Sequence, residues 1–314
     1  MDQLQDIFKK KISINKNLIE IGDDVEHNQQ QTVDIFSTKW KEVEQLNEVE
    51  KLYDFQYDWF LKLYGFDSEE TLAAYLKNKI IIDTGCGLGY KAAWFARLAP
   101  ESIVLGVDIS DSIYLAAKNF SQFNNLYFFK GDISNTTIKE NKIDFVVCDQ
   151  VIMHANSPEN AFKHLSEITK EGGEFACYVY RKKALPRELI DDFFRGHTHN
   201  IPDDKMWEFS AQLTELGKRL SELKVSFDCP AIPILGIEEG TYDIQRFIYW
   251  NFLKCFWKED WGFELSKSTN YDWYAPSNAK RFSKEEFEAM INESNLKVSF
   301  FHEEEACYSG RFLK

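Results

Sequence analysis

The stretch Ile80–Pro100, IIIDTGCGLGYKAAWFARLAP, constrains the fold of this chain more than any other segment. An apolar run ends in Asp83, and glycines at alternate positions then lead into a helix-forming sequence. Glycine tolerates positive φ and lets a ligand approach the backbone, and a helix N-terminus favours negatively charged groups. In a parallel α/β sheet, ligands bind where the strands end. We therefore predict a ligand site at Gly85, Gly87 and Gly89.

The segments that follow alternate between short apolar runs and amphipathic runs. Strands are predicted at 79–83, 103–107, 126–129, 145–148 and 174–180, with helices at 89–98 and 111–120 between them. Ser157 and Pro158 are typical of a helix start, and Ser283 with Glu286 forms a capping-box pattern before another helix. Strands that alternate with helices indicate a parallel sheet with right-handed crossovers. The fold class is therefore α/β, a Rossmann-like doubly wound sheet.

Changes in this alternation suggest four parts. Residues 1–70 are predicted to form a helical N-terminal cap, and residues 71–182 the ligand-binding α/β core. Residues 183–270 are rich in aromatic side chains and are predicted to be a helical insertion, either a substrate lid or a dimer interface. Residues 271–314 are expected to supply the last helix and a closing pair of strands.

Charge and composition narrow the classes of partner. The formal net charge is −14, and the strongest basic cluster is the short run Arg181–Lys183, which disfavours a nucleic-acid substrate. No long apolar run suits a membrane, and the first residues lack the apolar core of a signal peptide. The six cysteines are scattered, as expected for reduced thiols. A cytoplasmic protein that acts on a small molecule is the favoured interpretation.

Two further acids follow strands on the same edge of the predicted sheet. Asp108 ends the second strand in VLGVDIS, where a carboxylate can accept hydrogen bonds from both hydroxyls of a ribose. Asp132 follows the third strand in FKGDIS, where it could accept from an adenine amino group while Ile133 packs on the ring. One nucleoside ligand accounts for these residues and for the glycine loop together.

The ordered motifs DTGCGLG, VDIS, GDI, IDFVVCDQVIMH and EGGEFACYVY resemble those of class I S-adenosylmethionine-dependent methyltransferases. The resemblance implies a sheet with an antiparallel last strand and S-adenosyl-L-methionine as cofactor, with S-adenosyl-L-homocysteine as product. It implies contacts to the methionine part, the ribose and the adenine. The implied cofactor-binding residues are Asp83, Gly85, Gly87, Gly89, Asp108, Ile109, Asp132, Ile133 and Asp149. STKWKEV, with Trp40, resembles a segment that caps the cofactor in bacterial small-molecule methyltransferases.

Methyl transfer from a sulfonium is an in-line displacement, which depends chiefly on positioning. A base is required only where the acceptor holds its proton tightly. The segment CDQVIMHANSP after the fourth strand supplies His154 as the candidate base and Asp149 as a second candidate catalytic residue. Both also have an ordinary interpretation, as a loop histidine and as a residue that orients the cofactor.

The acceptor is expected to meet residues from several segments. Candidate substrate-binding residues are Gln150, Tyr180, Tyr242, Arg246 and Tyr274, which combine aromatic faces with polar groups. Aromatic faces and acids would suit a cationic amine, whereas Arg246 would suit a carboxylate or phosphate. No metal site is predicted, because His197 and His199 lack a clear third ligand.

The leading hypothesis is a methyltransferase that modifies an O or N atom of a small metabolite. An NAD(P)-dependent oxidoreductase is an alternative on a similar sheet, but Ala92 stands where its third glycine is expected. A non-catalytic relative that binds the cofactor is another alternative. A homodimer through residues 183–270 would equally use exposed aromatic side chains.

Overall fold

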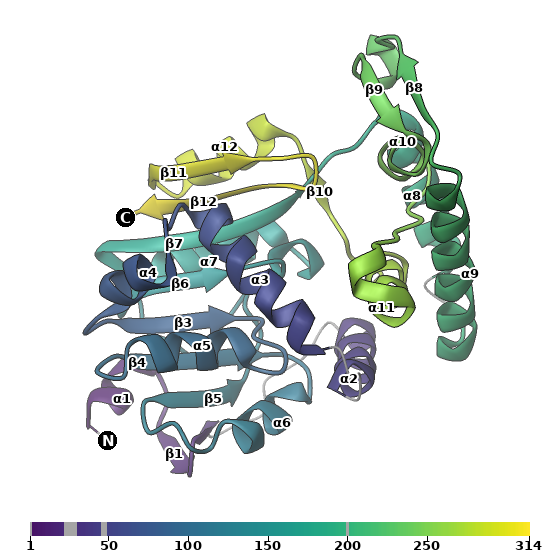
Figure 1. The fold of residues 1–314 in the computed structure, drawn as a ribbon. Helices are drawn as coiled ribbons and strands as arrows, with labels where there is room; N and C mark the ends of the chain where they lie inside the picture. The colour runs from purple at the N-terminus through teal and green to yellow at the C-terminus, as the bar shows by residue number, and fades with distance from the viewer. Residues whose placement is uncertain (1, 22–29, 45–48, 199–200) are drawn as a thin grey trace. The chain divides into compact units, whose positions relative to one another are not determined.

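The computed structural model describes residues 2–21, 30–44, 49–198 and 201–314. The chain divides into two compact units, which we describe separately (Figure 1). The sheet unit comprises Met1–Glu44, Tyr53–Arg181 and Lys280–Lys314. The insertion unit comprises Gln45–Leu52 and Lys182–Ala279.

A ten-stranded sheet organises the sheet unit. Its main path runs in the order β1-β2-β5-β4-β3-β6-β7-β12-β11, and β10 pairs with β7 off this path. The neighbouring strands from β5 to β7 are parallel, whereas β12 is antiparallel to β7. This confirms the predicted doubly wound sheet with an antiparallel last strand. The strand bounds are β1 Ile12–Asn15, β2 Leu18–Ile21, β3 Ile80–Thr84, β4 Ile103–Asp108, β5 Leu126–Lys130, β6 Ile143–Cys148, β7 Thr169–Arg181, β10 Arg281–Phe282, β11 Lys297–Glu303 and β12 Cys307–Leu313.

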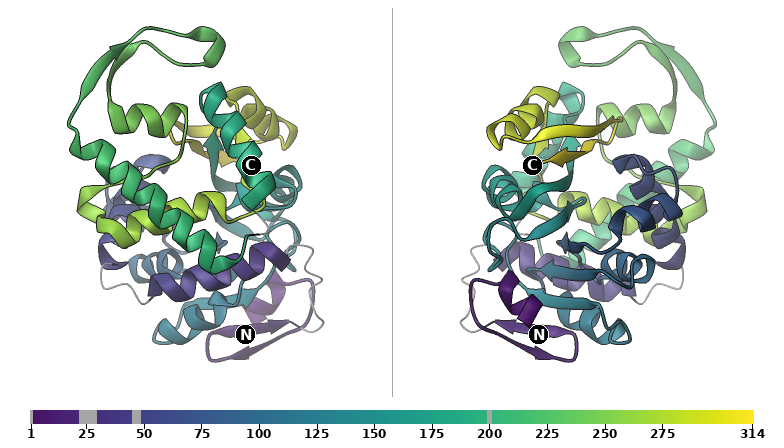
Figure 2. Two further views of the ribbon diagram at one scale, coloured as in Figure 1. Left: turned by 90° about the vertical axis from the view of Figure 1, so that its right-hand side faces the viewer. Right: turned by 90° about the vertical axis from the view of Figure 1, so that its left-hand side faces the viewer.

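Helices cover both faces of this sheet (Figure 2). Successive strand residues point to opposite faces, so Ile81 joins the core beneath α5 and Ile82 joins the core beneath α7. Strands buried on both faces need apolar residues throughout, which explains the runs that the sequence shows. The helices are α1 Asp2–Ile7, α2 Gln30–Glu44, α3 Val49–Tyr64, α4 Glu69–Leu76, α5 Tyr90–Leu98, α6 Ser112–Asn119, η1 Ile152–His154, α7 Pro158–Ile168 and α12 Lys284–Glu293.

Two of the predicted helix starts have the expected cap geometry. The Ser157 side chain accepts a hydrogen bond from the Asn160 amide, with Pro158 in the first turn of α7. Ser283 and Glu286 form the reciprocal capping box at the start of α12. Side-chain caps satisfy amides that the first helical turn leaves without partners. These local signals could therefore be read from the sequence.

The insertion unit is mostly helical. A short hairpin of β8 and β9 interrupts the helices, and the sequence analysis did not anticipate it. The unit also extends beyond the expected boundary at residue 270, because α11 continues to Tyr274 and the following residues cluster with it. A comparable omission concerns residues 1–70, where the β1–β2 hairpin accompanies the expected helices and extends the sheet. The insertion elements are α8 Leu185–Thr198, α9 Asp203–Glu222, β8 Ser226–Cys229, η2 Pro233–Leu235, β9 Gly240–Asp243, α10 Ile244–Asn251, η3 Glu259–Trp261 and α11 Gly262–Tyr274.

Candidate functional site

The glycine loop joins β3 to α5 at the carboxyl end of the sheet. Gly85, Gly87 and Gly89 have φ angles of 74°, 52° and 81°, a region that favours glycine. At Gly85 a Cβ atom would lie 2.3 Å from a methyl group of Val151, so the loop also packs too closely for a side chain. The Gly87 amide donates to the Asp108 carboxylate over 2.8 Å. This hydrogen bond joins the glycine loop to the acid that ends β4.

Helix α2 lies over this loop. A Cβ atom on Gly87 would come within 2.7 Å of the Trp40 ring, so glycine is required where the indole approaches the backbone. The Asp111 amide donates to Ser37 of α2 over 3.2 Å, and the ring centroids of Phe36 and His154 lie 5.2 Å apart. Trp40 therefore lies beside the glycine loop, in a helix that also contacts Asp111 and His154.

The acids at the ends of β3 and β4 are both buried. Burial raises the pKa of Asp83 to about 6, partly offset by the nearby Lys91, while Asp149 and Asp108 raise it further. Burial also raises the pKa of Asp108, against hydrogen bonds from Ser110 and from the Gly87 amide. Ionised acids held together in a buried site favour a cation placed among them.

The predicted adenine-binding pair follows β5. The Ser134 amide donates to the Asp132 side chain over 2.7 Å, which fixes the turn after the strand. Ile133 is 7% exposed and packs in the apolar core on the α7 face of the sheet. Ile109, the residue after Asp108, is half-buried.

Asp149 lies in a buried ion pair that the sequence analysis did not anticipate. Lys91 of α5 donates to one carboxylate oxygen, and the Tyr64 hydroxyl donates to the other over 2.9 Å. Burial alone would lower the pKa of Lys91, but Asp149 and Asp83 outweigh it and hold that pKa above its usual value. Both carboxylate oxygens of Asp149 thus accept hydrogen bonds within the sheet unit, and this geometry suits a positioning role better than a base.

Three predicted residues lie near the ends of β6 and β7. His154 is 6% exposed, and its ring lies between those of Phe36 and Tyr180, with centroids 5.2 and 5.7 Å away. Gln150 has a φ angle of 64°, uncommon for a residue with a side chain. Such backbone strain clusters at functional sites. The structure therefore places His154, Tyr180 and Gln150 in one unit with the glycine loop.

The remaining candidates lie in the insertion unit. Tyr242 donates to the Glu238 carbonyl oxygen over 3.0 Å, and the Arg246 guanidinium lies 5.6 Å from the Tyr249 ring centroid. Tyr274 is fully buried, and its hydroxyl donates to Asp191 over 2.9 Å. Tyr274 is therefore part of that unit's core, where buried polar contacts already engage its hydroxyl.

Comparisons with known proteins agree with this geometry. A family model described as a methyltransferase domain matches residues 76–224, which contain the glycine loop and the acids. The match covers just under half of the chain, so residues 76–224 are similar to a methyltransferase domain. The strand order with its antiparallel last strand is the sheet that the family resemblance implies.

Individual proteins with similar sequences match parts of the chain. An uncharacterised methyltransferase of Schizosaccharomyces pombe is 29% identical over 128 residues, 36% of this chain and 46% of the relative. The sterol 24-C-methyltransferase of Saccharomyces cerevisiae is 29% identical over 108 residues, 33% of this chain and 28% of that protein. A malonyl-[acyl-carrier protein] O-methyltransferase of Marinomonas is 22% identical over 168 residues, 51% and 62% of the two chains. The chain therefore spans less than two thirds of these relatives.

The residues at the glycine loop fit the methyltransferase cofactor, S-adenosylmethionine. Asp83, Asp108 and Asp149 are buried near one another, with Lys91 as the basic side chain paired among them. A cofactor with a sulfonium and an ammonium group complements this excess of acids. Within the described residues, no cluster of three or more His, Cys, Asp or Glu could hold a metal ion, and His199 lies outside those residues.

Proposed function

We propose that this chain is an S-adenosylmethionine-dependent methyltransferase that methylates an O or N atom of a small metabolite. One observation carries the proposal above all: the Gly87 amide and the Ser110 amide both donate to Asp108, which places a buried carboxylate against the glycine loop. Each carboxylate oxygen can accept more than one hydrogen bond, so Asp108 retains acceptor capacity for ribose hydroxyls.

The chain's own residues divide the work of binding and positioning. When bound, the cofactor supplies an activated methyl group. We assign Asp83 to its ammonium group, the backbone of Gly85 and Gly87 to its methionine part, and Trp40 to a cap over the glycine loop. Lys91 and Tyr64 hold Asp149 by its two oxygens, and the adjacent Gln150, which has a left-handed backbone conformation, donates to the same carboxylate.

We assign the acceptor's proton to His154. Its ring lies between Phe36 and Tyr180, and two aromatic contacts fix the orientation of the imidazole. Asp149 is the weaker candidate for this role, because Lys91 and Tyr64 already bind its carboxylate. The base matters only for an acceptor that does not lose its proton readily.

A small acceptor follows from the charge of the chain. A net charge of −14 works against a phosphate-rich polymer. Relatives named for sterol carbon methylation and for O-methylation show that the named acceptors of similar proteins differ, so the acceptor atom must be measured.

All six cysteines are free thiols, and none of the described helices combines the length and apolar character needed to cross a membrane. These features support our proposal of a cytoplasmic protein.

We also propose that the insertion unit can mediate a homodimer. Leu185, Leu189 and Phe193 lie at four-residue spacing on α8, and each side chain is exposed. Analytical ultracentrifugation of the wild type and of Leu189→Glu tests this contact. A monomer in both proteins would contradict it.

Calorimetric titration with S-adenosylmethionine and S-adenosylhomocysteine tests the cofactor assignment, with NADH as the control ligand. We expect micromolar binding of the first two ligands and its loss in Asp108→Ala. A screen of metabolite pools with a labelled methyl donor then identifies the acceptor, and mass spectrometry of the product identifies the atom. Binding of NADH alone would overturn the proposal.

A further inference from the structure

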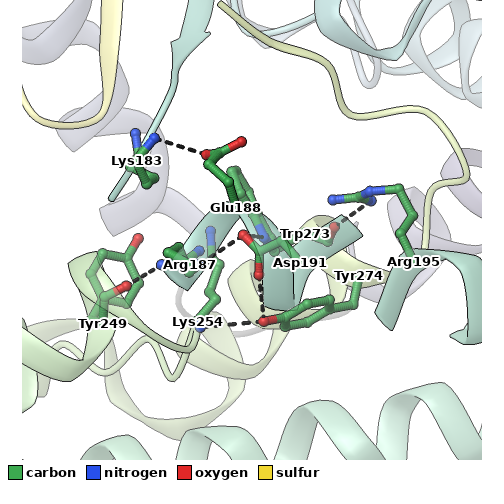
Figure 3. Close-up of polar contacts among 9 residues, drawn as sticks. All are labelled: Lys183, Arg187, Glu188, Asp191, Arg195, Tyr249, Lys254, Trp273 and Tyr274. Carbon is green, nitrogen blue, oxygen red and sulfur yellow. Dashed lines mark hydrogen bonds and ion pairs between the residues drawn. The ribbon is translucent and has the colours of Figure 1, made fainter. Parts of the chain in front are cut away.

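The core of the insertion unit contains a buried ionic cluster (Figure 3). Asp191 of α8 is completely buried and accepts hydrogen bonds from Arg187, Trp273 and Tyr274 at 2.7, 2.9 and 2.9 Å. Arg187 is 1% exposed and also donates to the Tyr249 carbonyl oxygen. The single carboxylate at the centre is thus fully engaged by groups from α8 and α11.

A second arginine, Arg195, is also committed to contacts within this unit. One guanidinium nitrogen donates to the carbonyl oxygens of Trp273 and Pro276, each over 2.8 Å. The arginine therefore holds the end of α11 and the residues that follow it. Its role is explained by the backbone that it binds.

Lys254 differs from both arginines. It follows α10 and is 7% exposed, and its ammonium nitrogen lies 4.5 Å from the Trp273 ring centroid and 5.9 Å from that of Tyr249. Its backbone amide donates to the Tyr274 hydroxyl over 3.3 Å, which fixes the position of the residue. Among the residues that the structure describes, no oxygen atom forms a hydrogen bond or an ion pair with its ammonium group.

The charges around Lys254 do not balance. Of the described residues in this unit, the buried charged side chains are the cations Arg187, Arg195 and Lys254 and the acid Asp191. The half-buried Asp272 is a second acid that acts on Lys254, so three cations face two acids. A buried cation is costly unless it is paired and hydrogen-bonded. Arg187 is paired with Asp191, and Arg195 donates to two backbone carbonyl oxygens. The ammonium group of Lys254 instead lies over the faces of two aromatic rings. An ammonium group in this setting is suited to an anion that the chain itself does not supply.

We propose that Lys254, between Trp273 and Tyr249, binds a carboxylate or phosphate group of a small ligand, and that this ligand is the methyl acceptor. The last clause rests on the proposed function. The aromatic rings would contact the apolar part next to the anion, and the ammonium group would donate to its oxygen atoms. The acceptor class is then an anionic metabolite that also carries the O or N atom to be methylated.

The electrostatics of the cluster agree with this geometry. Burial, together with the positive charges of Arg187 and Arg195, lowers the pKa of Lys254 to about 7, against the opposing effect of Asp272 and Asp191. The nearby Tyr249 and Tyr274 have pKa values above the usual range because they are buried, so both hydroxyls stay neutral where Lys254 titrates. An oxyanion beside Lys254 would favour its protonated form and raise that pKa.

The direct test follows the titration of Lys254 in the full chain. Lysine labelled with carbon-13 at Cε reports each amine by NMR, and Lys254→Met identifies the resonance. Inorganic phosphate and acetate are the probes, with sodium chloride at the same ionic strength as the control. We expect a midpoint near 7 without probe and a saturable upward shift of at least about one pH unit, a tenfold change in proton affinity.

The two probes distinguish the sources of the anion. A shift with acetate at lower concentration assigns a carboxylate, and the reverse assigns a phosphate. Lys205 is an exposed lysine of the same unit, and its resonance should respond to neither probe. A Lys254 midpoint near that of Lys205, or an equal shift with chloride, would overturn the anion site.

Two variants distinguish a failure of the anion site from a failure of the proposed cofactor binding. In calorimetric titrations, Lys254→Met should keep the binding of S-adenosylmethionine and lose the binding of the probes, whereas Asp108→Ala should do the opposite. If the wild type binds the probes but not S-adenosylmethionine, the proposed function fails and Lys254 is not a methyl-acceptor site. Melting curves show that each variant is folded, and Lys254→Gln is the second variant if methionine disturbs the core.

Discussion

The sheet unit buries more acids than cations beside its glycine loop, whereas the insertion unit buries more cations than acids in its core. Asp83, Asp108 and Asp149 lie with Lys91 in the first unit. Arg187, Arg195 and Lys254 are buried with Asp191 in the second. Each unit therefore contains charge that its own pairs do not balance, and the signs are opposite. A cationic donor and an anionic acceptor would complement the two excesses.

The largest effect is expected for a change at Asp191, the buried acid among the described residues of the insertion unit. Asp191→Ala leaves Arg187 buried without a carboxylate and removes the acceptor of Trp273 and Tyr274. Breaking a buried pair from one side costs roughly 3–5 kcal/mol. Chemical denaturation should show this loss in the free energy of unfolding. The exposed neighbour Asp192, changed to Ala, serves as the control, and an equal loss in both variants would contradict the assignment.

The corresponding change in the sheet unit removes Lys91, the cation paired with Asp149. Lys91→Met leaves Asp149 with the Tyr64 hydroxyl and the Gln150 side-chain amide as donors, and it deprives Asp83 of a neighbouring positive charge. We expect a loss of about 3 kcal/mol in the free energy of unfolding, less than for Asp191 because two hydrogen bonds to the acid survive. The exposed Lys118, changed to Met, should have no comparable effect. Unchanged stability of Lys91→Met would show that Asp149 does not depend on this pair.

A smaller effect is expected from replacing glycines that have positive φ angles. Two such replacements distinguish a loss of cofactor binding from backbone strain. Gly87→Ala adds a Cβ atom against Trp40 at a φ angle of 52°, and we expect roughly a tenfold loss of cofactor affinity, or about 1.4 kcal/mol. Gly172 also has a positive φ, 76°, but nothing lies within 4 Å of an added Cβ atom. Gly172→Ala therefore carries the strain alone and should lower stability by roughly 1–2 kcal/mol without changing affinity. Calorimetry on both variants decides whether the Trp40 contact matters.

The smallest effect is expected from a change of pH. The pH dependence of cofactor affinity tests the role assigned to Asp83. Its pKa is raised to about 6, so the carboxylate is ionised above that pH and protonated below it. If it accepts from the cofactor's ammonium group, affinity should be constant above pH 6. Below pH 6 it should fall, approaching a tenfold loss per pH unit well below the midpoint. Asp83→Asn should remove this dependence, whereas Asp111→Asn should retain it. A wild-type profile without a step near pH 6 would contradict the contact.

Local chemistry explains how much of this molecule the sequence could predict. Some features depend only on neighbours within a few residues: the apolar strands, the glycine loop and the helix caps at Ser157 and Ser283. The structure contains each of these predicted features. The buried pairs depend on distant segments. Lys91 lies in α5 and Tyr64 in α3, yet both reach Asp149 at the end of β6. Nothing near Lys91 in the sequence distinguishes it from an exposed helical lysine.

In the insertion unit, too, contacts between distant segments could not be predicted from the sequence. Arg187 and Asp191 are four residues apart in α8, a spacing normally typical of an exposed helix pair. Only the packing of α11, which supplies Trp273 and Tyr274, buries this pair. Aromatic composition predicted a helical unit, but it could not identify which charged side chains the aromatics enclose.

The pairing of β10 with β7 has a consequence for protein engineering. Arg281 lies opposite Tyr180 and Phe282 opposite Arg181, in neighbouring parallel strands. Adjacent strands lie about 4.8 Å apart, so the sheet brings together the two chain segments that lead into and out of residues 182–279. A short flexible linker could close that gap without altering strand order. The region is thus a replaceable cassette, and grafting other sequences between these two strands would offer a route to new acceptor specificities on an unchanged scaffold.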